Sequence, residues 1–175
     1  DSPILTNSQF KKFKKFFSKK IKVIDCTFHV SLSLKDRIEE IREEAETSVR
    51  EGSTCLILSD KNISNRKASI PSILIVGAVH SHLVKLGLRG YCSLNVECSD
   101  ALDTHSFAVL IGVGATTVNP YLAIDSIYQR YEKKLFGKSD FESCVVKFKK
   151  SIDAGLLKIM SKMGISVISS YRGGC

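Results

Sequence analysis

The chain has 175 residues, and its hydrophobic content of 43% is enough for one compact domain with a sizeable core. Its longest apolar run, Ile70–Val79, is interrupted by Pro71, Ser72 and Gly77, whereas a membrane span needs roughly 18 consecutive apolar residues. The beginning, DSPILTNSQF, has no signal-peptide pattern. We therefore expect no membrane partner, and we interpret a chain that runs from Asp to RGGC as a piece of something longer.

The formal net charge of +8 is concentrated at the start of the chain. Residues 1–22 contain seven lysines and one aspartate, which gives them a charge of +6 and leaves +2 for the rest. A protein that binds nucleic acid more often spreads its basic residues along a face, together with aromatic or polar side chains that read the bases. The charge therefore belongs to one local element, and we expect no nucleic acid partner.

The six cysteines are scattered singly, mostly beside aliphatic residues. No two of them have the C-x-x-C spacing or another spacing typical of metal ligands. They indicate reduced thiols in a cytosolic type of compartment and no zinc or iron–sulfur site in this segment. We expect a cytoplasmic protein, with a plastid as the alternative location. The cysteines are Cys26, Cys55, Cys92, Cys98, Cys144 and Cys175.

The basic element at residues 1–22 contains the first predicted helix, SQFKKFKKFFSKK at 8–20. Four phenylalanines fall on one stripe of this helix and lysines surround the rest, while Ser8 fits the N-cap. We expect an amphipathic surface helix whose aromatic stripe lies on the core. A helix that binds a membrane or RNA is the alternative. The four residues are Phe10, Phe13, Phe16 and Phe17.

Alternating strand and helix patterns fill the remainder of the chain. Short apolar runs predict strands at 21–25, 54–58, 91–96, 116–118 and 165–168. Amphipathic stretches bounded by capping residues predict helices at about 34–49, 71–87, 103–111, 121–134 and 140–163, and the polar stretch 61–70 is predicted as a loop. This order requires a parallel sheet with right-handed crossovers, so we predict an α/β fold. The pattern alone leaves an open sheet and a barrel-like sheet as alternatives.

The stretch VLIGVGATTV (109–118) is similar to the start of a dinucleotide-binding loop, in which a strand runs into a Gly-x-Gly turn. Such a loop needs a third small residue three positions after the second glycine, and a helix directly behind it. Here Thr117 stands three positions after Gly114, and the following residues are typical of a strand. We interpret Gly112 and Gly114 as a turn between a helix and a strand. The alternative is a phosphate site of an independent enzyme.

Three histidines are candidates for chemistry. His80 and His82 point to different sides of a predicted helix, so their spacing is not that of a zinc pair. His105 is accompanied by no carboxylate or cysteine at ligand spacing. We expect these histidines to donate to backbone carbonyls near strand ends or to cap helices.

Four acidic residues, Asp60, Glu97, Asp100 and Asp103, come at or just after predicted strand ends. Parallel α/β folds gather binding groups at this edge of the sheet, so an active site there is one interpretation. We expect instead that these side chains cap the helices that follow. No nucleophile elbow, P-loop or metal cluster stands out. We therefore predict no catalytic, cofactor-binding or metal-binding residue in this segment.

Four stretches together resemble the central domain of the glutamate synthase large subunit. They are LILSDKNIS (56–64), IPSILIVGAVHSHLVKLGLR (70–89), FAVLIGVGATTVNPYLA (107–123) and AGLLKIMSKMGISVISSYRGG (154–174). The resemblance covers nearly the whole chain, and the last stretch is the most specific. The chain departs from the family at His80-Ser81-His82, where three histidines are usual, at His105-Ser106, where two are frequent, and in its lysine-rich start. These departures argue against a catalytic role for the histidines.

The resemblance implies that residues 1–175 are a single α/β domain, the later part of this central domain, with a barrel-like or incomplete barrel topology. In the family an amidotransferase domain releases ammonia from glutamine, and an FMN-binding domain with a [3Fe–4S] cluster uses it to convert 2-oxoglutarate into glutamate. The electron donor is NADPH or ferredoxin, and a small NADPH-oxidising subunit is a further possible partner.

For this segment the resemblance implies a catalytically inactive connector near the ammonia passage that holds no cofactor. Two alternatives stay open. One is an independent α/β enzyme that binds a phosphate or a nucleotide, and the other is a binding module built on the basic helix.

Overall fold

The computed structural model describes residues 2–174, so the prediction for Cys175 lies outside the described part. The elements follow one another as α1 (Asn7–Phe16), β1 (Ile21–Asp25), β2 (Thr27–His29), α2 (Leu34–Arg50), β3 (Cys55–Ser59), β4 (Lys67–Ser69), α3 (Ser72–Lys85), the 3-10 helix η1 (Arg89–Tyr91), β5 (Ser93–Glu97), α4 (Thr104–Gly112), β6 (Thr117–Asn119), α5 (Tyr121–Glu132), α6 (Phe141–Lys162) and α7 (Ile168–Tyr171).

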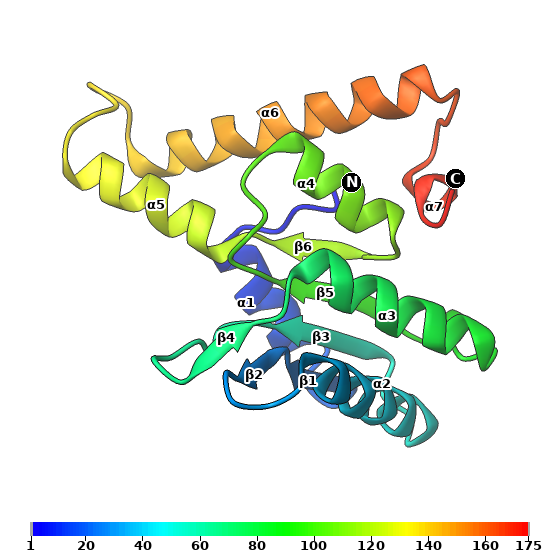
Figure 1. The fold of residues 1–175 in the computed structure, drawn as a ribbon. Helices are drawn as coiled ribbons and strands as arrows, with labels where there is room; N and C mark the ends of the chain where they lie inside the picture. Colours follow the sequence, from blue (N-terminus) through cyan, green and yellow to red (C-terminus); the bar gives the residue numbers. More distant parts are fainter. Residues whose placement is uncertain (1, 175) are drawn as a thin grey trace.

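The centre of the fold is a parallel sheet of four strands in the order β1-β3-β5-β6 (Figure 1). Helices connect one strand to the next, which is why neighbouring strands run in the same direction. The predicted α/β fold with a mainly parallel sheet is therefore confirmed. Strand order follows chain order, as it does in a barrel, and the sheet stops after four strands. Among residues 2–174, no helix has the length and apolar character to cross a membrane.

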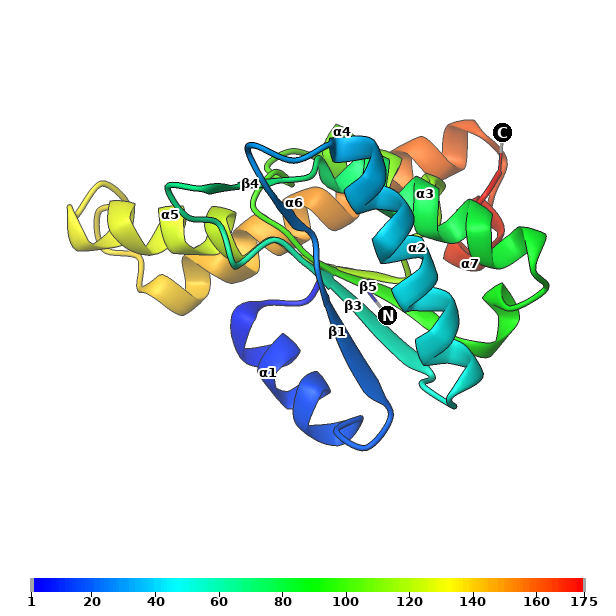
Figure 2. The same cartoon turned by 60° about the horizontal axis from the view of Figure 1, so that its bottom comes forward.

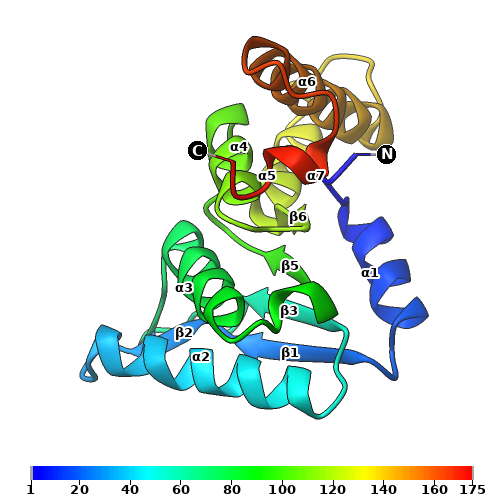
Figure 3. The ribbon, with the colours of Figure 1, turned by 90° about the vertical axis from the view of Figure 1, so that its right-hand side faces the viewer.

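One face of the sheet, here called the outer face, is covered by α2, α3 and α4 (Figure 3). Alternate residues of each strand point to this face and are buried. Each of these fully buried aliphatic side chains contributes about 1.5–3 kcal/mol, so the outer face holds most of the core. The strand residues are Ile24, Leu56, Leu58, Leu94, Val96 and Val118, each at most 1% exposed.

The opposite face, here called the inner face, carries α1 (Figure 2). Phe10 is 2% exposed and packs with Cys55 and Ile57 of β3, and Phe13 and Phe17 lie beside them. The expectation of an aromatic stripe on the core is confirmed for these three phenylalanines. It is wrong for Phe16, which is 82% exposed, because adjacent helical residues point about 100° apart.

The bounds of α1 also differ from the prediction. Its N-cap is Thr6, not Ser8: the Thr6 hydroxyl accepts a hydrogen bond from the Gln9 backbone N–H at 3.3 Å. The Gln9 side chain in turn accepts one from the Thr6 N–H at 3.0 Å. This reciprocal arrangement satisfies two helix-end donors that Ser8 would leave open.

The N-terminal segment closes the β6 edge of the sheet. Ile4 pairs with Val118 in parallel, the Leu5 N–H donates to the Val118 carbonyl, and the Val118 N–H donates to the Pro3 carbonyl, both at 2.9 Å. Ile4 is 1% exposed. Residues 3–5 therefore act as a short extra strand, and they lead α1 onto the inner face.

The predicted strand at 165–168 is wrong. Gly164, with φ +70, ends α6, and the Ile165 N–H donates back to the Met160 carbonyl at 2.9 Å. The chain then turns into α7, and Ile165 and Ile168 pack partly buried against the core. A strand here would have no edge to join next to β6, because residues 3–5 already occupy it.

A small antiparallel sheet of β2 and β4 was not predicted. Thr27 pairs with Ser69 and His29 with Lys67, so the stretch 61–70 contains a strand where we expected only a loop. Strands of three residues are too short to give a recognisable alternation of apolar and polar positions.

Candidate functional site

Four polar side chains line up on the inner face at the carboxyl ends of the parallel strands. The register places Asp25 of β1 beside Ser59 of β3, Ser59 beside Glu97 of β5, and Glu97 beside Asn119 of β6. We call these residues the carboxyl-end row. Since barrel-type α/β proteins gather their functional groups at this end of the strands, the row is the candidate site.

Glu97 is the centre of the row. It is 3% exposed, and its Oε1 atom lies 2.9 Å from Lys14 Nζ and 3.1 Å from Lys61 Nζ. The Ser59 hydroxyl donates to Oε2 at 2.8 Å. Burial alone would raise the pKa of Glu97, but the hydrogen bonds from Lys14, Ser59 and Lys61 outweigh it and lower the pKa. Glu97 is therefore a charged, fully engaged carboxylate and not a base that awaits a proton.

Asp60 follows Ser59 of the row directly in the chain and is 3% exposed. Its Oδ2 atom accepts from the Ser99 N–H at 2.9 Å and from the Ser99 hydroxyl at 2.6 Å. Its Oδ1 atom is buried without a hydrogen bond from the described residues. Burial and the nearby Asp60 charge raise the pKa of Tyr121. The Tyr121 ring also contacts Lys61, whose Nζ atom lies 5.0 Å from the ring centre. Asp60 thus ties the loop after β3 to the loop after β5.

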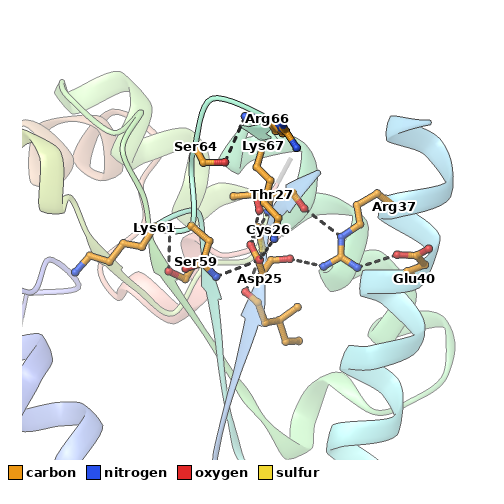
Figure 4. A network of polar contacts seen from close by, with 12 residues as sticks. Asp25, Cys26, Thr27, Arg37, Glu40, Ser59, Lys61, Ser64, Arg66 and Lys67 are labelled. Atoms are coloured by element: carbon orange, nitrogen blue, oxygen red, sulfur yellow. Dashed lines mark hydrogen bonds and ion pairs between the residues drawn. The ribbon is translucent and has the colours of Figure 1, made fainter. Parts of the chain in front are cut away.

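Asp25, at the other end of the row, organises the turn between β1 and β2 (Figure 4). It accepts from the Thr27 N–H at 3.0 Å, the Thr27 hydroxyl at 2.7 Å and the Asn62 side chain at 3.1 Å, and it lies 3.5 Å from Lys67 Nζ. Burial opposes ionisation, but the hydrogen bonds from Thr27 and Asn62 lower the pKa of Asp25. Arg37 of α2 donates to the Asp25 and Thr27 carbonyls at 2.7 and 3.2 Å.

Asn119, the last member of the row, is 1% exposed and donates to the Leu5 carbonyl at 2.9 Å and to Asn7 Oδ1 at 3.0 Å. Each member of the row is thus hydrogen-bonded to another part of the same chain. Two of them, Glu97 and Asn119, take their partners from α1 or the segment before it. The row holds α1 in place over the inner face.

The expectation that strand-end acids cap the helices that follow them holds for one of the four residues, Asp103. Asp103 accepts from the Ser106 N–H at 2.8 Å and caps α4. Asp100 accepts from the Ser72 N–H at 2.9 Å, so it reaches the first residue of α3, a helix that precedes it in the chain. The expectation is also wrong for Asp60 and Glu97, because serine and lysine side chains from other segments take their oxygen atoms.

The Gly112–Gly114 segment joins α4 to β6 as a turn, as predicted. Gly112 is the last residue of α4, and Gly114 has φ +127. A Cβ atom on Gly114 would overlap the His80 ring. The glycine is thus needed for its backbone conformation and for the close approach of α3.

The prediction that histidines contact backbone carbonyls or cap helices is wrong for His80 and His82. His80 accepts from Arg89 Nε at 3.0 Å, and His82 lies 3.0 Å from Glu46 of α2, so both contact side chains instead of backbone carbonyls or helix ends. They do point to different sides of α3, as expected. His105 lies at the surface, in a shallow hollow with Asp100 and Ile73. Within residues 2–174, no three His, Cys, Asp or Glu side chains are grouped closely enough to hold a metal ion.

Comparison with known families decides what kind of domain this is. The family model described as "Glutamate synthase central domain" matches residues 1–175. The chain belongs to this family. The resemblance seen in the four sequence stretches is therefore confirmed.

The curated relatives of this central domain are much longer proteins. The chain is 51% identical over 177 residues to the large chain of glutamate synthase [NADPH] from Azospirillum brasilense, covering 99% of the chain and 12% of the relative. It is 42% identical over 152 residues to the chloroplastic ferredoxin-dependent glutamate synthase of Spinacia oleracea, covering 81% of the chain and 9% of the relative. The matched segment is thus a small part of both relatives' length.

Solved structures add information on the fold alone. A mutant flavocytochrome b2 with benzoylformate superposes with a TM-score of 0.59 at 17% sequence identity, and the match covers 97% of this chain and 52% of that one. The structural neighbours are barrel-like enzymes. The incomplete-barrel topology of the central domain is therefore confirmed.

Sequence reasoning missed most of the carboxyl-end row of this central domain, although one signal was present. The last inward-facing residue of each parallel strand is polar. In β3 the inward-facing residue one layer below is the apolar Ile57, but in β5 it is the buried polar Asn95, so the contrast is clear in β3 and absent in β5. Lys14 left no such signal, because nothing in the sequence relates the first helix to the third strand of the sheet.

Proposed function

We propose that residues 1–175 are a single domain, the later part of a glutamate synthase central domain, and that this domain is a structural connector without a catalytic residue of its own. The parent chain would convert glutamine and 2-oxoglutarate into two molecules of glutamate. The connector would hold the amidotransferase and FMN-binding domains of that chain in a fixed relation.

The observation that carries this proposal is that the candidate site is occupied by the chain itself. The side chains of α1 pack on the inner face, and Lys14 and Lys61 neutralise Glu97. A catalytic site needs groups that are free to contact a substrate. In the carboxyl-end row these groups contact each other, which is what a rigid packing element requires.

The packing of α1 side chains on the inner face also argues against a flavin bound to this segment. Phe10 covers Cys55 and Ile57 on the inner face, and both lysines that could bind a phosphate already contact Glu97. The residues present therefore do not fit FMN. We place FMN and the [3Fe–4S] cluster of the parent chain in other domains, and no step of the chemistry runs through this one.

Rigid packing also suits a position beside an ammonia passage. Ammonia that reaches bulk water at neutral pH is protonated and lost from the reaction, so the domains that enclose its path must stay closely packed. The parent enzyme would be cytoplasmic. Its electron donor would be NADPH, supplied through a small NADPH-oxidising subunit, or ferredoxin, since relatives that depend on NADPH and on ferredoxin match this chain at 40% and 42% identity.

The test uses the full-length parent enzyme with Ile57→Ala, which leaves a cavity under α1, and Lys12→Ala as an exposed control on the same helix. Glutamine hydrolysis and ammonia-dependent glutamate formation should each persist in both variants. Ile57→Ala should form fewer than the two molecules of glutamate per glutamine that full coupling gives, because ammonia escapes where the connection between the two sites is loosened. A fall in ammonia-dependent synthesis itself, with the flavin still bound, would contradict the connector role.

A further inference from the structure

Two arginines meet at the turn that follows α4. Arg89 of η1 donates to the Gly114 carbonyl at 2.8 Å and to the Cys92 carbonyl at 2.6 Å. Arg172, directly after α7, donates through Nε to the Ala115 carbonyl at 3.2 Å. The two guanidinium groups therefore bind neighbouring peptide groups. We call Arg89 and Arg172 the arginine pair.

The C-terminal segment is fixed at the same place. The Gly173 N–H donates to the Gly112 carbonyl at 2.7 Å, and α7 lies beside α4 (Figure 1). Tyr171 is 9% exposed and packs against the core. The arginine pair is thus held by an ordered backbone on both sides, so its geometry is set before any ligand arrives.

The third basic side chain at this place is uncharged. Arg89 Nε donates to His80 Nδ1 at 3.0 Å, so this ring nitrogen is an acceptor and carries no proton. Burial and the charges of Arg89 and Arg172 lower the pKa of His80. The histidine positions Arg89 without adding a charge or removing one.

The arginine pair has no acidic partner among residues 2–174. No carboxylate in this range forms an ion pair with Arg89 or Arg172. Three arginines of α2, in contrast, each have one: Arg37 with Glu40, Arg42 with Glu39 and Arg50 with Glu46. Partly buried guanidinium groups are normally paired, because the loss of hydration must be offset.

Arg172 also keeps donors free. An arginine side chain has five N–H groups, and the hydrogen bonds to described residues involve only one nitrogen atom of Arg172. Its two terminal amino groups form the kind of fork that binds a carboxylate through two parallel hydrogen bonds.

We propose that Arg89 and Arg172 form a carboxylate-binding site, occupied by an Asp or Glu side chain from another domain of the same polypeptide. This inference rests on the proposed function, since it requires the longer chain. Relatives of about ten times this length have many candidate carboxylates outside the matched segment. The site would fix the second domain directly against the Gly112–Gly114 turn and the C-terminal segment.

The test converts one arginine into an amine that can be trapped. In the full-length enzyme, Arg172→Lys is treated with a carbodiimide, which forms an amide only between an amine and a carboxylate in contact, and the cross-linked peptides are identified by mass spectrometry. Arg50→Lys is the matched positive control, because Glu46 lies next to it. We expect Arg50→Lys to be linked to Glu46, and Arg172→Lys to a carboxylate outside residues 1–175.

A cross-link between Lys at position 172 and an acidic residue within the segment would overturn the proposal, as would no cross-link while the control reacts. If Arg172→Lys fails to fold, judged by circular dichroism, Arg89→Lys takes its place. A charge swap gives a second test. Arg172→Glu alone should lower the melting temperature, and the double variant in which the identified acid is also replaced by arginine should recover at least half of that loss.

A free anion is distinguished by a separate measurement. If phosphate raises the melting temperature of the full-length enzyme more than chloride does at equal ionic strength, and Arg172→Gln abolishes the difference, the occupant is a free anion and the proposal is wrong. If the parent gene encodes no flanking domains, the proposed function fails as well. A negative cross-linking result on an intact multidomain enzyme refutes only the carboxylate site.

Discussion

Lys14 and Glu97 lie 83 residues apart in the chain, yet their charged atoms are 2.9 Å apart on the inner face of the sheet. This contact joins the first helix to the third strand of the parallel sheet. Lys61 approaches the same carboxylate oxygen at 3.1 Å, so Glu97 would keep one cation if the other were removed. The stability of this arrangement can be measured.

We predict that the two lysines act non-additively. Lys14→Met should lower the free energy of unfolding by about 1 kcal/mol, since its side chain is 36% exposed and Lys61 still neutralises Glu97. The double variant with Lys61→Met should lose about 3–5 kcal/mol, because a buried carboxylate is left without a cation. Urea unfolding of the single and double variants measures both values. Equal and additive losses would show that the two contacts are independent.

The acid stability of the fold should depend on Glu97. Its pKa is lower in the folded state than in the unfolded chain, so its contribution is present above the unfolded value of about 4.3 and is lost as the pH falls through the folded pKa. We expect Glu97→Gln to unfold with a shallower pH dependence below about pH 5. Asp25, whose pKa is also lowered, should leave part of that dependence in place. Urea midpoints measured from pH 7 to pH 3 test this, and an unchanged slope in Glu97→Gln would contradict it.

Gly114 should be far less tolerant of substitution than another glycine that has a positive φ but open surroundings. Gly52 has φ +97 and no atom within 4 Å of a Cβ, so Gly52→Ala should cost about 1–2 kcal/mol from backbone strain. Gly114→Ala adds an overlap with His80 and should cost at least about 3 kcal/mol. The combination with His80→Ala should recover part of that loss. Similar unfolding energies for Gly52→Ala and Gly114→Ala would refute the role of the close contact.

Gly155 provides a test of the contact between α6 and α4. A Cβ atom there would overlap the Thr104 side chain, so Gly155→Ala should destabilise the fold although alanine is favoured in helices by about 1 kcal/mol. In the background of Thr104→Ala, which removes the overlapping atoms, the same change should become stabilising. Thermal unfolding of the four proteins in this double-mutant cycle gives the sign in each background. A stabilising effect of Gly155→Ala alone would contradict the contact.

Much of the fold could be predicted because its strands and helices have strong local patterns. The interior strand Cys55–Ser59 begins with four consecutive apolar residues, and the helix α2 has a clear apolar stripe and a capping Ser33. Patterns fail where a segment depends on a distant partner. The apolar pattern at Ile165 and Ile168 predicted a strand, but residues 3–5 occupy the sheet edge next to β6.

The candidate site was only partly predictable for the same reason. Glu97 and Asp60 were visible as acids at strand ends, yet their partners Lys14 and Ser99 come from a helix and a loop whose positions only the tertiary structure defines. The turn at Gly112–Gly114 was predicted correctly because local sequence distinguishes it from a nucleotide-binding loop: Thr117 stands where a third small residue is needed, and a strand pattern follows where a helix is needed. The neighbouring arginine pair depends on long-range contacts and left no sequence signal.

The central claim is that the carboxyl-end row holds this domain together and takes no part in the reaction. The most direct test is the turnover number for ammonia-dependent glutamate synthesis in the full-length enzyme with Glu97→Gln, corrected for the fraction of folded, flavin-containing protein. The account predicts a turnover number within about twofold of the unmodified enzyme, since only stability is affected. A loss of 100-fold or more in correctly folded enzyme would mean that Glu97 acts in the chemistry, and the account would be wrong.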